Sequence, residues 1–261
     1  MFLTDDEISL SKNFVKNGYI VFDCPEINIL QNITDFFIKE ISKYSPDIKN
    51  NKNHQAFLND IHKYISVKNL NKFRLDIINK MTQDKNLRKN YYLISKKILD
   101  IIVGNELAMQ NRVNLSIQFP KDDSSLLPVH ADTWSGDSPF EVVVWIPLVD
   151  CFHTKSMYIL PPKKFKKIEK KIKSVKDSNG LFKLIRNDLD WINIKYGQIL
   201  IFNQSLPHGN VVNKTKETRW SMNCRFKSLF SPYGDKGIGE FFEPITLRAA
   251  TKLGLEYKFP F

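Results

Sequence analysis

Residues 219–227 read RWSMNCRFK, and the alternation of polar and apolar side chains in this stretch decides the fold. The polar set takes every second position and consists of Arg219, Ser221, Asn223, Arg225 and Lys227. Successive side chains of a strand point to opposite faces of a sheet, so the stretch predicts a strand with one apolar and one polar face. A polar face of this kind lies either against solvent or against a wet cavity between two sheets. The arginines flank a candidate metal motif, and this favours the cavity.

Other strands are expected in the same half of the chain, and helices in the half before it. Residues 112–119 alternate in the same way, and apolar runs predict the strands 141–148, 156–160 and 198–202. Apolar residues at helical spacing predict a helix over 28–44 and mostly helical structure over 54–104. Near the N-terminus, a capping box at residues 4–7 predicts a short helix, and the strand 18–22 follows it. Helices followed by short strands indicate an α+β protein with a mainly β core, built as a sandwich or barrel.

The candidate metal motif is His130-Ala131-Asp132. On an extended segment this spacing points the imidazole and the carboxylate to the same side. A second histidine, His208, comes at the end of the apolar strand 198–202, where a side chain can enter a cavity. Two histidines and one carboxylate on one face form the facial triad that binds non-haem Fe(II) and leaves coordination positions open.

Arg219 lies eleven residues after His208, and Ser221 shares its face of the strand. A guanidinium can bind a carboxylate bidentately, and a serine hydroxyl can hydrogen-bond the same group. Iron that takes a bidentate 2-oxo acid and O₂ needs such an anion clamp for the far carboxylate of the acid. A structural ion pair is the alternative role for Arg219.

Composition limits the protein class. The 261 residues are 42% hydrophobic, which indicates a globular chain, and they contain no apolar run long enough for a spanning helix. Three widely spaced cysteines and an N-terminus without a signal-peptide pattern are consistent with the cytoplasm. The net charge of +11 favours acidic partners, although diffuse lysine on a solvated surface explains it as well.

Together these residues resemble the Fe(II)/2-oxoglutarate-dependent oxygenases, specifically the phytanoyl-CoA dioxygenase-like branch. The resemblance rests on His130-x-Asp132, on His208 and on Arg219-x-Ser221, and it extends to residues 17–22 and 145–150. The family often has Pro-Gly-Ser-His where this chain has Pro161-Pro-Lys-Lys. The sequences around His130 and Arg219 also resemble those of family members from bacterial carbohydrate-biosynthesis gene clusters.

The resemblance implies a double-stranded β-helix, or jelly roll, with helices packed on one sheet. It implies a single oxygenase domain over 1–261, with strand and helical support in 1–105, a jelly-roll core in 106–230 and a C-terminal extension in 231–261. The cofactors implied are Fe(II), 2-oxoglutarate as co-substrate, and O₂. Related halogenases replace the carboxylate ligand by a small residue, so Asp132 favours hydroxylation.

The resemblance also assigns roles to individual residues. His130, Asp132 and His208 would hold the metal, and Arg219 with Ser221 would bind 2-oxoglutarate. Further candidate contacts to co-substrate or substrate are Asn210, Gln118, Asn114 and Trp134. For Gln118 and Asn114, a position facing solvent is an equal alternative.

The substrate is expected to be a small anionic molecule, such as a sugar carried on a nucleotide or another phosphate. A lysine-rich stretch, residues 163–176, is either a solvated helix with one apolar stripe or a rim for the anion. Two other functions stay open: a non-catalytic jelly-roll protein that binds a sugar or nucleotide sugar, and an oxygenase that acts on nucleic acid. A homo-oligomer is possible for each of these functions.

Overall fold

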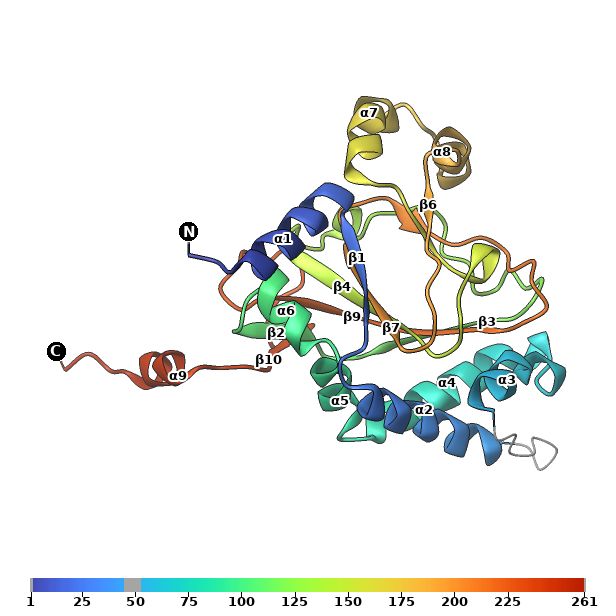
Figure 1. The fold of residues 1–261 in the computed structure, drawn as a ribbon, viewed down its shortest axis with the longest axis horizontal. Coiled ribbons are helices and arrows are strands. Elements are labelled where there is room, and N and C mark those ends of the chain that lie inside the picture. The colour runs from blue at the N-terminus through green and yellow to red at the C-terminus, as the bar shows by residue number, and fades with distance from the viewer. Residues whose placement is uncertain (1, 45–52, 261) are drawn as a thin grey trace.

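The computed structural model describes residues 2–44 and 53–260. In this part of the chain, two antiparallel sheets face one another, and helices cover the outer face of the larger sheet (Figure 1). The larger sheet contains β1 (Tyr19–Asp23), β2 (Leu107–Gln110), β3 (Asn114–Gln118), β4 (Glu141–Pro147), β7 (Gln198–Asn203), β9 (Arg219–Ser228) and β10 (Phe242–Pro244). The smaller sheet contains β5 (Tyr158–Ile159), β6 (Asp190–Trp191) and β8 (His208–Gly209).

The strand order identifies the fold. The larger sheet runs β1-β7-β4-β9-β2-β10, and β3 pairs with the first half of β9. The smaller sheet runs β6-β5-β8, and a bridge between His130 and His208 extends it by one position. From β3 to β9 the chain therefore passes back and forth between the two sheets, except that β5 and β6 are successive strands of the smaller sheet. This is the winding of a double-stranded β-helix. The α+β class and the jelly-roll core predicted from the sequence are confirmed.

Apart from α1 and α6, which pack on each other, the helices of the described chain occupy three regions. Their bounds are α1 (Asp5–Asn17), α2 (Ile27–Ser42), α3 (His54–Asn59), α4 (Val67–Gln83), α5 (Leu87–Leu93), α6 (Lys96–Ile102), α7 (Pro162–Ile172), α8 (Ser178–Ile185) and α9 (Ala249–Glu256). Short 3₁₀ turns are η1 (Ile61–Lys63), η2 (Asp132–Ser135) and η3 (His153–Lys155). Helices α2 to α5 lie along one side of the larger sheet, α7 and α8 lie at the opposite end of the molecule, and α9 projects away from the body (Figure 1).

The apolar face of β9 anchors the helical layer. Trp220 is fully buried, and its ring lies 6.1 Å from the ring of Phe37 on α2 and 6.1 Å from that of Phe73 on α4. Its indole nitrogen donates to the carbonyl of Leu58 at 2.9 Å. On α5, Tyr91 donates its hydroxyl to Val144 of β4. The alternation in residues 219–227 therefore separates a face that packs on helices from a face that lines the interior between the sheets.

The N-terminal signals are present in the structure. Thr4 caps α1 in a capping box with Glu7, and Gly18 ends the helix at φ 77°. A Cβ at Gly18 would lie 2.2 Å from Cδ1 of Leu206, and residues with side chains rarely adopt the φ of 77°, so glycine is favoured between α1 and the loop before His208.

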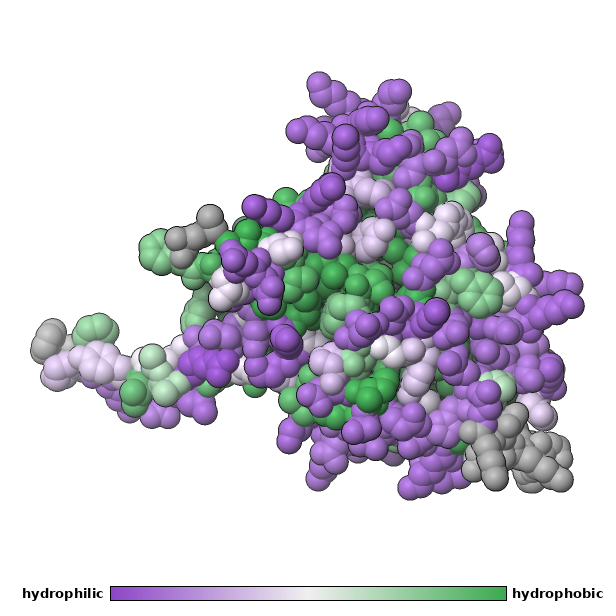
Figure 2. Space-filling model, in the orientation of Figure 1, coloured by the Kyte–Doolittle hydropathy of each residue, from purple (hydrophilic) through white to green (hydrophobic). Residues whose placement is uncertain are grey.

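The lysine-rich stretch forms α7, as its apolar spacing predicts. Ile168 packs on a second, smaller core with Leu160, Leu181 and Ile185, while the lysines face outward. The end of the molecule that carries α7 and α8 is accordingly hydrophilic in Figure 2. Among the described residues, no helix combines the length and the hydrophobicity that a membrane span would need.

Candidate metal and substrate site

His130, Asp132 and His208 come together from the segment before η2, from η2 and from β8. His130 and His208 pair through their backbones, with N–O distances of 3.0 and 2.8 Å. Asp132 starts η2, and its amide donates to the carbonyl of Gln204 in the turn after β7. The carboxylate oxygen Oδ1 of Asp132 lies 3.4 Å from Nε2 of His130 and 3.9 Å from Nε2 of His208. The ligand atoms of the three residues all lie within 4.8 Å of one another.

Backbone carbonyls determine which imidazole nitrogen faces the cluster. Nδ1 of His130 lies 2.7 Å from the carbonyl of Pro128, and Nδ1 of His208 lies 2.9 Å from that of Leu206. A carbonyl can only accept, so in the neutral form of each imidazole Nδ1 carries the proton and Nε2 keeps its lone pair. Metal-binding histidines are oriented in this way by the groups behind them.

Arg225 is the cation nearest to the cluster. Its Nη2 lies 3.0 Å from Oδ2 of Asp132, the oxygen that does not face the histidines. Its Nε donates to Gln204 at 2.9 Å, and Gln204 in turn donates to the buried Glu141 at 2.7 Å. Arg225 therefore occupies one carboxylate oxygen and leaves Oδ1 directed at the two imidazoles.

The electrostatics of the cluster favour one anion and at least one neutral imidazole. Burial alone would raise the pKa of Asp132, but His130, His208 and Arg225 outweigh it and hold that pKa well below its usual range. Burial, followed by the neighbouring His130, lowers the pKa of His208 to about 4. Burial also opposes the charged form of His130, but hydrogen bonds to Asp132 and to the carbonyl of Pro128 raise its pKa overall.

This donor set fits a divalent transition metal. Nitrogen and oxygen ligands lie about 2.0–2.2 Å from such an ion, so donors around one ion are roughly 3–4 Å apart. The distances from Asp132 to the two histidines fall in that range. Two imidazoles and a monodentate carboxylate on one side of an ion form the facial triad of non-haem Fe(II) sites.

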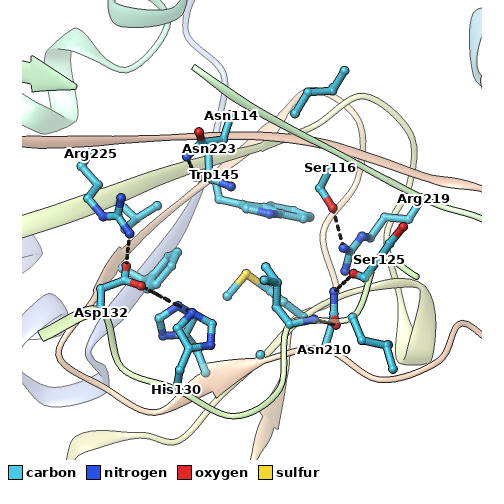
Figure 3. A pocket seen from close by; sticks show the side chains of 18 of the residues that line it. Asn114, Ser116, Ser125, His130, Asp132, Trp145, Asn210, Arg219, Asn223 and Arg225 are labelled. Carbon is cyan, nitrogen blue, oxygen red and sulfur yellow. Dashed lines mark hydrogen bonds and ion pairs between the residues drawn. The ribbon is translucent and has the colours of Figure 1, made fainter. Parts of the chain in front are cut away.

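A cavity of about 450 Å³ opens beside the triad, which lies on its wall. This volume is within the usual range of small-molecule sites. The arginines on its wall are Arg74, Arg219 and Arg225, and no lysine of the described chain lines it. Figure 3 shows His130, Asp132 and Arg225 at one end of the cavity, Arg219 at the other, and Trp145 between them.

At the end away from the triad, Arg219 is buried in a polar pocket. Its Nη2 donates to the hydroxyl of Ser116 at 2.8 Å, and its Nη1 donates to the carbonyl of Ser156 at 3.2 Å. Burial lowers the pKa of Arg219 to about 10. Among the described residues its Nε has no hydrogen-bond partner, and neither does the buried hydroxyl of Ser221. A cation buried with no described ion-pair partner is costly unless an anion joins it, so this end of the cavity is suited to an acid.

The other residues suggested by the sequence lie in different places. Asn210 lines the cavity, but its amide is bonded to the backbone of Leu127 and Ser125, in the loop before His130. Asn114 is exposed at the cavity wall and donates to Asn223.

Three further suggested residues are not on the wall of the cavity. Gln118 donates to the carbonyl of Val211, and its carbonyl oxygen is buried and has no partner in the described part of the chain. Ser221 lies behind Arg219, in register with Ser116. Trp134 is 48% exposed on η2.

Sequence reasoning missed several residues of the site. Ser116 and Asn223 share the polar faces of their strands, so the alternation could have identified them. Trp145 is an aromatic residue in an apolar strand, and Arg74 lies on α4, distant in sequence from every motif. No local pattern distinguishes these two residues from core and surface positions.

Comparison with known proteins gives relatives in structure alone. No protein-family model and no curated protein sequence matches the chain. A non-heme monooxygenase, ThoJ, in complex with nickel has a TM-score of 0.51 at 14% identity, covering 93% of this chain and 90% of its own. Apo EctD from S. alaskensis has a TM-score of 0.54 at 14% identity, covering 92% and 86%.

A third similar structure is HygX from Streptomyces hygroscopicus with nickel and 2-oxoglutarate bound. Its TM-score is 0.51 at 12% identity, and the match covers 87% of this chain and 88% of HygX. At these identities the likeness is one of fold, and it extends over most of each chain.

Proposed function

We propose that this protein is an Fe(II)- and 2-oxoglutarate-dependent oxygenase that hydroxylates a small anionic or carbohydrate-linked substrate and releases succinate and CO₂. One observation carries the proposal. A facial triad with correctly oriented imidazoles shares a cavity with a buried guanidinium for which the described chain supplies no carboxylate. The proposal includes membership of the phytanoyl-CoA dioxygenase-like branch, on the motifs quoted above.

His130, Asp132 and His208 would hold the iron through Nε2, Oδ1 and Nε2. The backbone carbonyls behind the histidines fix the imidazole tautomers, and Arg225 directs the carboxylate. With iron, a 2-oxo acid and O₂ bound, such a site supplies the oxidising power for attack on a substrate C–H bond. The chain contributes the relative placement of metal, co-substrate and target carbon.

Arg219 would bind the far carboxylate of 2-oxoglutarate. The unpartnered Nε and the nearby hydroxyls of Ser116 and Ser221 are suited to that group. Asn210 would position the loop before His130, because its amide is already bonded to that loop.

Known structures of the same fold support the proposed cofactors. HygX has been solved with iron, and with nickel and 2-oxoglutarate, and EctD with 2-oxoglutarate and 5-hydroxyectoine. The proposed substrate class rests on the resemblance to members from carbohydrate-biosynthesis clusters and on the basic character of the cavity wall.

The direct test is succinate release from 2-oxoglutarate in the presence of Fe(II) and O₂. Asp132→Ala should abolish it because the metal loses its only anionic ligand. The matched control Glu169→Ala removes an exposed carboxylate on α7 and should retain it. Arg219→Lys should raise the 2-oxoglutarate requirement roughly ten- to a hundredfold, the loss expected when charged hydrogen bonds are broken.

Full succinate release by Asp132→Ala would refute the triad. An unchanged 2-oxoglutarate requirement in Arg219→Lys would show that another residue binds the far carboxylate of 2-oxoglutarate. Sugar binding that persists without iron, and without any turnover, would instead indicate a non-catalytic binding protein.

A further inference from the structure

A third guanidinium, Arg74, reaches the cavity from the helical layer outside the jelly roll. It lies in the middle of α4, which packs beside β3. Its Nη2 donates to the carbonyl of Ile117 at 3.3 Å and to the hydroxyl of Ser125 at 2.5 Å. Both contacts place the guanidinium at the cavity wall beside Ser124 and Ser125.

The remaining donors of Arg74 are unused. Its Nε is buried without a hydrogen-bond partner in the described residues, and no described acceptor bonds to its Nη1. No carboxylate of the described chain forms an ion pair with it, whereas Arg225 pairs with Asp132. Burial lowers the pKa of Arg74, and Asp122 offsets this only in part. The carboxylate of Asp122 is bonded to the amide and hydroxyl of Ser124.

A half-buried cation without a counter-ion is unfavourable, and an anionic ligand would relieve the cost. In the proposed site with iron and 2-oxoglutarate bound, Arg225 pairs with Asp132, and Arg219 pairs with the far carboxylate of 2-oxoglutarate. Arg74 is then the cavity arginine that still lacks an anion.

We infer that Arg74 binds an acidic group of the substrate, either a carboxylate or a phosphate, at the part of the cavity wall beside Ser124 and Ser125. The inference rests on the proposed function, which assigns Arg219 to the co-substrate. Arg74 would then make the enzyme selective for acidic molecules. A guanidinium with free donors recognises such a group through directed hydrogen bonds as well as through charge.

The lysine-rich helix α7 is the competing source of positive charge. Its lysines are absent from the described wall of the cavity, and Lys164 pairs with Asp188 on the outer surface. Recognition of the anion inside the cavity therefore falls to arginine.

The test uses protein saturated with Ni(II) and 2-oxoglutarate, so that the triad and Arg219 are occupied and no turnover occurs. Inorganic phosphate and acetate are titrated in separate calorimetric experiments, which distinguish a phosphate site from a carboxylate site. Arg74→Met keeps the apolar stem and removes the charge. Lys72→Met removes an exposed charge from the same helix and is the matched control.

We expect one phosphate or acetate per chain, bound roughly ten- to a hundredfold more weakly by Arg74→Met and unchanged in Lys72→Met. The affinity of Arg74→Met for 2-oxoglutarate should equal that of the wild type, which shows that the cavity is intact. Equal anion affinity in Arg74→Met and wild type, saturable binding of neither probe, or loss of 2-oxoglutarate binding in Arg74→Met would each overturn the inference.

The titrations also distinguish a failure of this inference from a failure of the proposed function. If the wild type binds no 2-oxoglutarate, the same titrations on metal-free protein still report whether an anion site depends on Arg74.

Discussion

Arg225 is the residue that controls how Asp132 can bind a metal. It donates to Oδ2 of the carboxylate and is itself held by Gln204, so Oδ1 faces the two imidazoles. Groups behind the ligands of a metal site typically contribute 10- to 100-fold in metal affinity. We therefore expect Arg225→Met to weaken Ni(II) binding by about that factor, measured by calorimetry, with a native circular dichroism spectrum.

Arg186→Met removes an exposed arginine at the end of α8 and is the control. Wild-type Ni(II) affinity in Arg225→Met would show that the carboxylate needs no partner behind it.

The pKa values of the triad predict proton release on metal binding. His208, with its pKa lowered to about 4, is already neutral near pH 7, and Asp132, with its lowered pKa, is already ionised. His130 has a raised pKa and holds its proton to higher pH than usual. A metal binds the neutral imidazole, so affinity should fall as the pH decreases through the pKa of His130.

Calorimetry in buffers of different ionisation enthalpy measures this release, and the number of protons released per metal ion should rise toward one as the pH is lowered through the pKa of His130. Metal binding that is independent of pH between about pH 8 and about pH 6 would contradict the account.

The sequence identifies the three candidate metal-binding residues that the structure brings together, because their spacing carries the signal. It does not identify the residues that surround them. His130 and Asp132 alternate on an extended segment, and His208 follows a strand. Arg225 was visible on a polar face, but its contact with Asp132 depends on the register between β9 and the rest of the larger sheet. Arg74 enters the site from a helix, and only the tertiary fold brings it there.

Among the elements, β9 connects the cavity beside the triad to the helical layer. Its inner face carries Arg219 and Arg225, and on its outer face Trp220 packs between α2 and α4. Trp220→Phe would leave the carbonyl of Leu58 without its donor and open a gap beside the helices. We expect a loss of about 1–3 kcal/mol in the free energy of unfolding, measured by urea denaturation.

Trp191→Phe is the comparison, because Trp191 is only partly buried on the smaller sheet. An equal loss in both variants would mean that Trp220 does not anchor the helices.

The long elements were predictable, and most of the shortest ones were not. The alternation in residues 219–227 and the helical stripe of α2 are long enough to show their period. The two-residue strand β5 lies within the predicted strand 156–160. The strands β6 and β8 also have two residues each, which is too few for a pattern. The strands β2 and β10 pair across more than a hundred residues of chain, so tertiary contacts define them.

At the scale of the whole molecule, two separate groups of basic residues contribute to the net charge of +11. Lysines dominate α7 and face solvent, while arginines line the cavity. Exposed charges are screened over about 8–10 Å at physiological salt, so the helix should act weakly on the site. The triple variant Lys166→Gln/Lys170→Gln/Lys173→Gln should change 2-oxoglutarate affinity by less than about twofold.

The same triple variant also tests the two alternative partners of the lysine helix. A large loss of affinity for phosphate-bearing molecules would show that lysines of α7 bind the anion at the rim of the cavity. Turnover on oligonucleotides alone, with a steep salt dependence that the triple variant reduces, would indicate a nucleic-acid substrate.

The central claim is that one cavity holds Fe(II) through the triad and 2-oxoglutarate through Arg219. Anaerobic titration of the metal-free protein with Fe(II) and then 2-oxoglutarate tests it most directly. When the 2-oxo acid chelates the metal, a weak visible charge-transfer band should appear and saturate at one equivalent of each. Asp132→Ala should show no band, and Arg219→Lys should reach it only at higher 2-oxoglutarate concentration. A wild-type protein that shows no band with both present, or an Asp132→Ala variant that shows the full band, would contradict the account.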